Sequence, residues 1–310
     1  MIAQTDGARA AAAALKPARR PVNRDWLWAL FFLGPNLVLF LVFTAFPILF
    51  GFGVSFFNWN ILEPPVFAGF GNYDKFFFND PLTGKVVRNS LVYVLGALPA
   101  SVLAPMVLAA LLNAKLRATA FYRSLYFLPL VTSGVAAATV FKWIYSYQFG
   151  PLNGFIGFFG IPKQDWLFSD ALVLPALILM AIWHRIPLNI IFFLAALQGV
   201  PSHLYEAAQI DGAGVWARFW HVTWPMITPT TFFVLIVTTI NMLLGAFDTV
   251  NVMTQGGPLD ASNVFVFNIY RTAFVYFQMG YASAMAYILF VVVLSFTVLQ
   301  WVAQRYWVHY

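Results

Sequence analysis

The sequence predicts an all-α membrane protein whose chain crosses the bilayer several times. Of its 310 residues, 61% are hydrophobic and only 9% are charged, a balance that soluble globular domains do not have. The apolar residues form runs of roughly 20 or more, enough for a helix to cross a bilayer, and they lack the alternation of barrel strands. Because lipid offers the backbone no hydrogen-bond partners, these runs are expected to be helices.

Six apolar runs are long enough to be spanning helices. They fall at about residues 27–57, 89–113, 121–145, 171–197, 225–247 and 281–303. The first run is much longer than the core of a signal peptide, so it is expected to remain as a span. An even number of spans places both termini on one side of the membrane. We therefore expect a basic tail at residues 1–26 and a six-helix membrane domain at residues 27–310.

Basic residues indicate which side faces the cytoplasm. Of the 17 Lys and Arg residues, ten lie on the side of the termini, five lie on the opposite side and two fall within spans. By the positive-inside rule, both termini are expected to be cytoplasmic. This topology accounts for the net charge of +6, and it favours anionic lipid headgroups over nucleic acid as neighbours of the tail.

The loop between the fourth and fifth spans, residues 201–224, is expected on the cytoplasmic side. Ser202 suits an N-cap, and the chain can then make about two helical turns before Gly212 ends the helix. After Gly214 we expect a second short helix, and Pro225 suits the first turn of the fifth span. Glycine and proline therefore predict a short helix that is exposed to the cytoplasm.

This short helix has the residues of a docking element. Ala207 and Ala208 are small enough to let another protein approach closely, and Glu206 offers that protein a carboxylate for a charged hydrogen bond. An ordinary cytoplasmic loop is the alternative that these residues leave open on physical grounds alone.

The sequence of the loop carries a specific resemblance. Residues 206–213 read EAAQIDGA, and with Phe219, Pro225 and Pro229 they resemble the signature loop of permease subunits of binding-protein-dependent ABC importers. Val222 and Trp224 stand where that family more often has Ile and Leu. The segments FDTVNVMTQGGP at residues 247–258, NIYRTAF at 268–274, GYASAMA at 280–286, LPLVTSGVAAATVFKWIY at 128–145 and LAALQGVPSHLYEAAQIDGA at 194–213 resemble its carbohydrate-uptake branch. Within that branch, the chain is similar to the first of two paired permeases, as in the maltose, lactose and glycerol-phosphate systems.

The resemblance implies a type I ABC importer permease in the cytoplasmic (inner) membrane of a bacterium. Its partners would be a second homologous permease, two ATP-binding subunits, an extracytoplasmic solute-binding protein and membrane lipid. It implies coupling to the ATPase through Glu206, Ala207, Ala208, Asp211, Gly212, Ala213 and Gly214. The resemblance also implies that this chain binds no cofactor and is not an enzyme, with ATP and Mg bound by the partner ATPases. The lack of a GxxxxGK(S/T) phosphate loop in the sequence agrees with this expectation.

Polar residues interrupt the fourth span at WHRIPLN, residues 183–189. An ionisable residue at that depth costs about 2.5–3.5 kcal/mol on insertion scales, and it marks a candidate functional site. Pro187 removes a backbone donor, so a kink there is expected to expose polar groups beside His184 and Arg185. The alternative is that Arg185 pairs with Asp248 or another carboxylate, or reaches the membrane interface, for a purely structural reason.

The resemblance to the maltose permease places solute contacts at His184, Arg185 and Leu188, and makes Asn241 a further candidate. A helix–helix hydrogen bond is the alternative for Asn241. The aromatic face of Trp183 suits the apolar side of a sugar ring, while Arg185 and His184 suit an anionic solute. The complete predicted solute path consists of Trp183, His184, Arg185, Leu188, Asn189, Thr239, Asn241 and Asp248.

Three other classes of function remain as alternatives at this point. One is an interaction or scaffold protein, which would leave His184 and Arg185 within a span without an explanation. An ion-coupled secondary transporter of a small polar solute usually shows inverted repeats with paired broken helices, and the sequence has no such pairing. A membrane enzyme would need an acid–base pair, a nucleophile or a metal cluster, and Glu206 with His203 and His221 matches no such signature. The four His residues share no metal-ligand spacing, so no metal site is expected.

Overall fold

The computed structural model describes residues 25–113 and 119–308, and it divides the chain into two compact units, residues 1–51 and 52–310. The predicted tail at residues 1–26 lies almost wholly outside the described residues. In the first unit, α2 (Asp25–Phe40) continues through the π-helical turn η1 (Leu41–Ala45) into α3 (Phe46–Val54). None of the segment at residues 28–54 is buried, as expected of an apolar helix whose neighbours are lipid or another protein.

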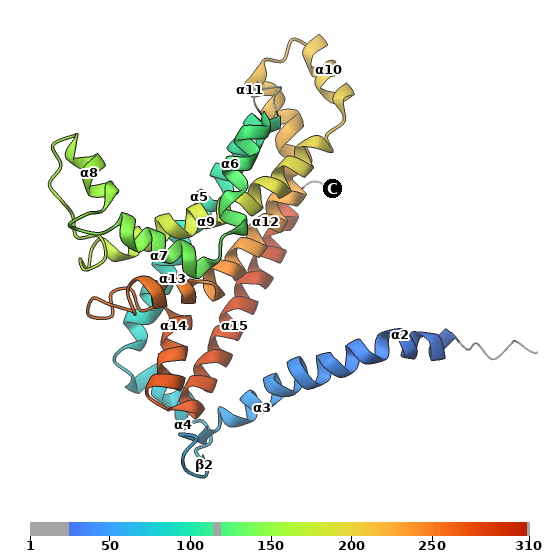
Figure 1. Ribbon diagram of the computed structural model, residues 1–310. Helices are drawn as coiled ribbons and strands as arrows, with labels where there is room; N and C mark the ends of the chain where they lie inside the picture. The colour runs from blue at the N-terminus through green and yellow to red at the C-terminus, as the bar shows by residue number, and fades with distance from the viewer. Residues whose placement is uncertain (1–24, 114–118, 309–310) are drawn as a thin grey trace, which may run out of the picture. The chain divides into compact units, whose positions relative to one another are not determined.

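The second unit is helical apart from one two-stranded hairpin (Figure 1). Its long helices are α5 (Thr83–Asn113), α9 (Val173–Gln198), α12 (Trp224–Leu244) and α15 (Met279–Ala303). The shorter elements are β1 (Phe57–Asn58), β2 (Val66–Phe67), α4 (Gly71–Asp74), η2 (Lys75–Asn79), α6 (Thr119–Val131), α7 (Gly134–Ile144), α8 (Pro151–Gly157), α10 (Ser202–Ile210), α11 (Val215–Arg218), η3 (Phe219–Thr223), α13 (Ala246–Met253), α14 (Phe265–Tyr270), η4 (Arg271–Val275) and η5 (Gln304–Tyr306). The prediction of an all-α membrane fold is confirmed.

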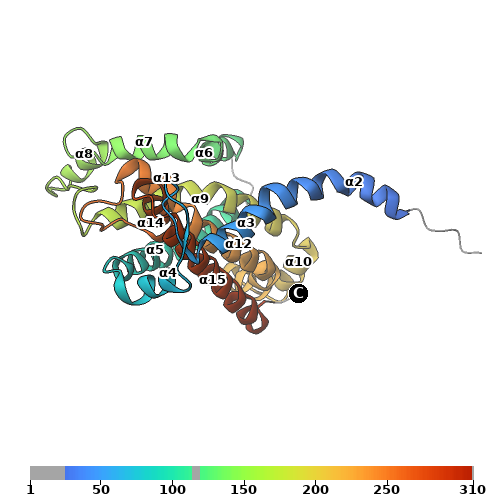
Figure 2. The same ribbon diagram turned by 90° about the horizontal axis from the view of Figure 1, so that it is seen from below.

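The long helices pack side by side, with α5 against α9 and α12 against α5, α9 and α15. Figure 1 shows α10 at one end of these helices and α4 with β2 at the other, and Figure 2 gives the view from below, from the end with α4. Among the described residues, five helical segments are long and apolar enough to cross a membrane, at residues 28–54, 83–113, 173–198, 215–253 and 279–306. A sixth crossing requires α6 and α7 together.

The third predicted span, residues 121–145, is not one straight helix. α6 and α7 are bent by 110° from each other at a short break. Pro129 lies in the last turn of α6, and the extended backbone of Ser133 precedes the start of α7. A Cβ at Gly134 would lie 3.4 Å from Asp248 Oδ2. Glycine at residue 134 therefore lets the break lie directly against α13.

The fourth span is one continuous helix, as its apolar run predicts. α9 runs without interruption from Val173 to Gln198, through the buried Pro187, so the proline does not break the helix. Phe193 and Ile190, further along α9, are fully buried in a cluster with residues of α5 and α12. α9 packs along both neighbours, and the kink expected at Pro187 stays a prediction.

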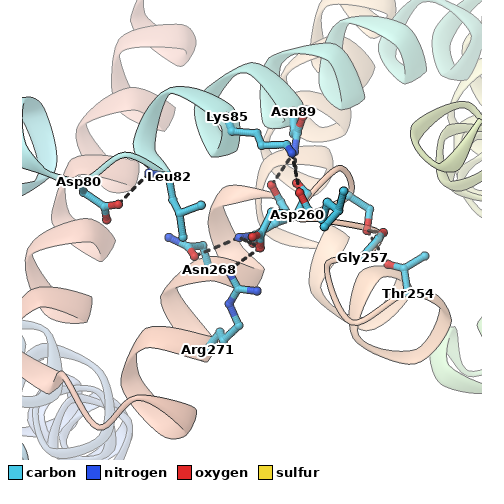
Figure 3. A network of polar contacts seen from close by, with 12 residues as sticks. Asp80, Leu82, Lys85, Asn89, Thr254, Gly257, Asp260, Asn268 and Arg271 are labelled. Atoms are coloured by element: carbon cyan, nitrogen blue, oxygen red, sulfur yellow. Dashed lines mark hydrogen bonds and ion pairs between the residues drawn. The ribbon is translucent and has the colours of Figure 1, made fainter. Parts of the chain in front are cut away.

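A polar network ties the loop at residues 254–264 to α5 (Figure 3). Asn89 donates to the carbonyl oxygens of Asp260 at 2.9 Å and Asn263 at 3.1 Å, and Lys85 donates to that of Leu259. Arg271 pairs with the carboxylate of Asp260 at 2.6 Å. Because backbone carbonyls receive most of these bonds, the network fixes the course of the loop itself.

Candidate functional site

The predicted docking loop forms two short helices, α10 and α11, and a glycine follows the end of the first. α10 begins at Ser202 with Pro201 as its N-cap, so the predicted N-cap role of Ser202 is wrong. Gly212 adopts φ +79°, a left-handed conformation that ends a helix without a Cβ clash. The amide of Ala213 then donates to the carbonyl of Ala208 at 2.9 Å, and α11 follows Gly214.

The α10 helix exposes most of its surface. None of its residues is buried, and Ile210 at its end is 86% exposed. Figure 1 shows α10 and α11 at the end of the unit, beyond the long helices. Of the seven residues predicted to couple to an ATPase, Ala208 and Ala213 are half-buried and the others are exposed.

One side-chain contact fastens this loop to the fifth span. The hydroxyls of Tyr205 and Thr223 lie 2.9 Å apart and share a hydrogen bond, which joins α10 to the turn that directly precedes α12. α10 also packs against α11 and η3. A displacement of α10 would therefore act on the start of α12 through these contacts.

A cavity of about 220 Å³ lies among the long helices. It is lined by Tyr93, Gly134, Met180, Ala181, His184, Arg185, Asn241, Met242, Gly245, Asp248 and Thr249. These residues come from α5, α7, α9, α12 and α13 and include Gly245 between the last two helices. The structure thus brings together four residues of the predicted solute path: His184, Arg185, Asn241 and Asp248.

Two of the residues that line this central cavity each have a buried nitrogen without a partner in the part of the chain that the structure describes. His184 Nε2 and Arg185 Nε are buried and have no hydrogen-bond partner among the described residues. Among the described residues the ion pair is Arg271–Asp260, and Arg185 forms none with Asp248. A structural role for Arg185 stays an alternative. Asn241 donates to Val237 of its own helix at 2.8 Å, not to a neighbouring helix.

An unpartnered buried donor costs about 1–3 kcal/mol, and a polar ligand could recover this cost by accepting the bond. The cavity offers donors from His184 and Arg185 and an acceptor from Asp248. In the described part of the chain, no three His, Asp or Glu side chains gather as a metal ion would require. The donors and the acceptor of the cavity are therefore suited to holding a polar molecule.

The other four residues of the predicted path lie outside the cavity lining. Asn189 is fully buried and donates to Ser101 O at 2.7 Å and Thr238 Oγ1 at 3.1 Å, so it joins α5, α9 and α12. Thr239 accepts a hydrogen bond from Gln300 of α15 at 2.8 Å. Trp183 packs against Phe141 with ring centroids 5.0 Å apart. Leu188 is half-buried on α9.

Seven of the residues that line the cavity were missed by the sequence reasoning, and Tyr93 and Gly134 are two of them. Tyr93 is a buried tyrosine in the middle of α5, and a lone tyrosine within a span was the available signal. Gly134 follows Ser133 at the break between α6 and α7. A small-residue pair soon after Pro129 was the signal there.

The profile of a protein family matches residues 82–308 of this chain, and its description is "Binding-protein-dependent transport system inner membrane component". The chain belongs to this family. The permease is 33% identical to the probable ABC transporter permease protein YesP of Bacillus subtilis, over 94% of each chain. It is 33% identical to the multiple sugar-binding transport system permease protein MsmF of Streptococcus mutans, covering 91% of this chain and 96% of MsmF.

Further similarities agree with the family. The lactose transport system permease protein LacF of Rhizobium radiobacter is 34% identical, with 88% of this chain and 93% of LacF covered. A chain of the bacterial alginate ABC transporter, solved with an alginate pentasaccharide-bound periplasmic protein, superposes with a TM-score of 0.78. It is 24% identical and covers 92% of this chain and 96% of its own, which establishes the fold.

The match confirms the resemblance drawn from the loop at residues 201–224, and it confirms the type I importer fold. The permease is an inner-membrane component of a transport system and, like its relatives, is not an enzyme.

Proposed function

We propose that this permease is one of two membrane subunits of an ATP-driven importer that carries a sugar or sugar derivative into the bacterial cytoplasm. The observation that carries the proposal is the similarity to permeases named for lactose and multiple-sugar transport over about nine-tenths of the chain. The central cavity, with its unsatisfied His184 and Arg185 donors, supports a polar solute. Hydroxyl and carboxylate oxygens are suitable acceptors for those donors.

The mechanism proposed for the complex is alternating access. Two partner ATPases bind and hydrolyse ATP with Mg, and they contact α10 through Glu206, Asp211 and Gly212. Closure of the ATPases moves α10, and the Tyr205–Thr223 hydrogen bond transmits this movement toward α12, which carries Asn241 into the cavity. ATP can bias the two states only if they differ in their contacts with nucleotide and solute.

The proposed topology places both termini and α10 in the cytoplasm. The hairpin and the loop at residues 254–264 would then face outward, toward an extracytoplasmic solute-binding protein. A second homologous permease would complete the translocation path. Affinity purification of the tagged chain from its native membrane, followed by mass spectrometry, tests this assembly: recovery of the chain with neither a second permease nor an ATPase would contradict it.

Substitution of Arg185 tests whether this side chain contacts the solute and whether the solute is anionic. We expect Arg185→Ala to lower ATP-driven uptake at least about tenfold, because a hydrogen bond from a charged donor is worth roughly 1.5–3 kcal/mol. The measurement is uptake by the reconstituted complex, with the solute first identified by screening the solute-binding protein against neutral and anionic sugars.

Arg88→Ala is the matched control, since Arg88 is an exposed arginine of α5 outside the cavity lining. If the solute is anionic, Arg185→Lys should keep most of the uptake, because lysine retains the positive charge. Unchanged uptake in Arg185→Ala would remove Arg185 from the solute path.

The loop at residues 254–264 holds a candidate contact for the solute-binding protein. Leu259 is 81% exposed and adopts φ +42°, a conformation that a branched residue rarely takes unless its surroundings impose it. The bonds from Lys85 and Asn89 to the carbonyls of Leu259 and Asp260 impose it here. We therefore expect Leu259→Cys, a single thiol in a chain without cysteine, to be shielded from a membrane-impermeant maleimide when the solute-loaded receptor binds.

The control for this labelling is Ile210→Cys on α10. It is similarly exposed at 86% but lies at the opposite end of the long helices. In right-side-out vesicles this thiol should not react at all until the membrane is permeabilised. Reaction of Ile210→Cys from outside would contradict the proposed topology, while unshielded labelling of Leu259→Cys would exclude Leu259 from the receptor contact.

A further inference from the structure

A second cavity lies at the opposite end of the long helices from α10. Its volume is about 670 Å³, within the range of about 300–1,000 Å³ that is usual for ligand sites. We call it the hairpin pocket. Asn58, Trp59, Asn60 and Glu63 of the β1–β2 hairpin line one side, and Lys75 and Gln278 lie among the residues that complete it. It shares no described lining residue with the central cavity.

The walls of the hairpin pocket are fixed by hydrogen bonds to the backbone. Asn72, which is buried, donates to Ser55 O at 2.9 Å and Phe57 O at 3.0 Å. The amide of Met279, at the start of α15, donates to Trp59 O at 2.9 Å. The hairpin is thereby tied both to α4 and to α15, so the pocket is formed in advance of any ligand.

The polar lining of the pocket combines donors and acceptors with no excess of charge. Glu63 contributes one negative charge and Lys75 one positive charge. Lys75 donates to Gln278 Oε1 at 2.8 Å, which leaves two further ammonium hydrogens and the amide NH₂ of Gln278. One oxygen of Glu63 accepts from Asn60 at 3.2 Å, and the carboxylate retains further acceptor capacity. A ligand that both donates and accepts matches this set.

Aromatic residues line the same pocket. Trp59 and Tyr281 are both part of its wall, and Lys75 Nζ lies 4.1 Å from the centre of the Tyr281 ring. Aromatic side chains offer an apolar face, while amides and charged groups offer hydrogen bonds. A neutral sugar ring has hydroxyls along its edge and C–H groups on its face. It can therefore bond to the polar groups and pack on the aromatic side chains.

We propose that the hairpin pocket is a second carbohydrate-binding site, which holds a neutral sugar unit of the solute on the side from which it arrives. The sugar class rests on the proposed function, whereas the pocket and its chemistry do not. The opposite charges of Glu63 and Lys75 cancel, which disfavours an anionic group in the hairpin pocket. An oligosaccharide could therefore bind one unit at each site in succession.

The test uses thiol labelling of the complete complex in nanodiscs, since this chain has no cysteine of its own. Asn58→Cys places a thiol in the pocket lining, and Leu62→Cys places one in the same hairpin outside the lining, where Leu62 is 83% exposed. The probes are lactose, arabinotriose and maltotriose, together with whichever solute the complex imports. At ten times its Kd, a sugar that occupies the pocket should slow labelling of Asn58→Cys about tenfold and leave Leu62→Cys unchanged.

A second variant separates binding from simple perturbation of the hairpin. Lys75→Met keeps an unbranched side chain over Tyr281 but removes the ammonium donors, so it should reduce the protection of Asn58→Cys. Arg185→Ala, in the central cavity, should leave this protection intact. The site is overturned if the imported sugar does not slow labelling, or if labelling slows only when the solute-binding protein is added, which would make the pocket a protein-docking surface.

The same measurements separate a failure of the proposed binding site from a failure of the proposed transport function. Protection of Asn58→Cys by a sugar in a complex that imports no sugar would support the pocket and contradict the proposed solute class. Sugar import without protection of Asn58→Cys would support the proposed function and exclude this site.

Discussion

Gly280→Ala is expected to prevent the start of α15 from packing against the hairpin, and to deplete the folded permease. A Cβ at residue 280 would lie 1.7 Å from the carbonyl oxygen of Phe57 and 2.9 Å from its carbon. These are backbone atoms, so no rotamer change relieves the clash. The hairpin is also held in place, because the amides of Met279 and Gly280 donate to Trp59 O.

The expected cost of Gly280→Ala is at least about 3 kcal/mol, at the upper end of overpacking by a single methyl group. The measurement is the yield of monodisperse tagged protein after mild solubilisation, followed by the midpoint of thermal unfolding in the same detergent. Gly280 is the first residue of GYASAMA, one of the segments that resemble the carbohydrate-uptake branch. The close contact with Phe57 supplies a physical reason for this glycine.

Gly84→Ala is the matched control for this substitution. Gly84 is the second residue of α5 as Gly280 is of α15, but a Cβ there would meet nothing within 4 Å. Alanine should be neutral or slightly stabilising at Gly84, because it favours the helix by up to about 1 kcal/mol. If the two variants gave the same yield and the same midpoint, the close contact at Phe57 would not be a constraint on the fold.

Much of the fold could be predicted because lipid restricts the backbone to helices, so long apolar runs translate directly into spans. The break between α6 and α7 could not be predicted in the same way. Its sequence is apolar on both sides, and hydropathy records how deep a residue lies but not the direction of the helix axis. In the sequence, the local signals of the 110° bend are Pro129 and the Ser133–Gly134 pair.

The candidate site was predictable in part for a related reason. A polar residue within a span faces either a cavity or a neighbouring helix, and sequence alone does not give its direction. His184 and Arg185 line the cavity, whereas Asn189, one turn further along the same helix, bonds to α5 and α12. Tyr93 reaches the cavity from α5, and only the packing of distant helices reveals this. The structure of the exposed loop at residues 201–224 was easier to predict, because glycine positions determine where its helices begin and end.

Glu206→Lys is expected to abolish ATP-driven uptake while the permease still folds and inserts. Glu206 is exposed on α10, and that helix has no buried residue, so the substitution removes no internal contact. A carboxylate that pairs with a basic group of the ATPase contributes roughly 1.5–3 kcal/mol, and reversing its charge adds repulsion, so docking should weaken more than about tenfold. Uptake by the reconstituted complex and co-purification of the ATPase measure the two consequences.

Gln209→Lys is the matched control, since it adds the same positive charge to an exposed position of α10 without removing the carboxylate. Uptake should survive in Gln209→Lys and fail in Glu206→Lys. Gly212→Val tests the geometry separately, because valine is strained at φ +79° and would change how α10 ends. Normal uptake in both Glu206→Lys and Gly212→Val would mean that α10 does not couple this permease to its ATPase, and the proposed route through Tyr205 and Thr223 would lose its starting point.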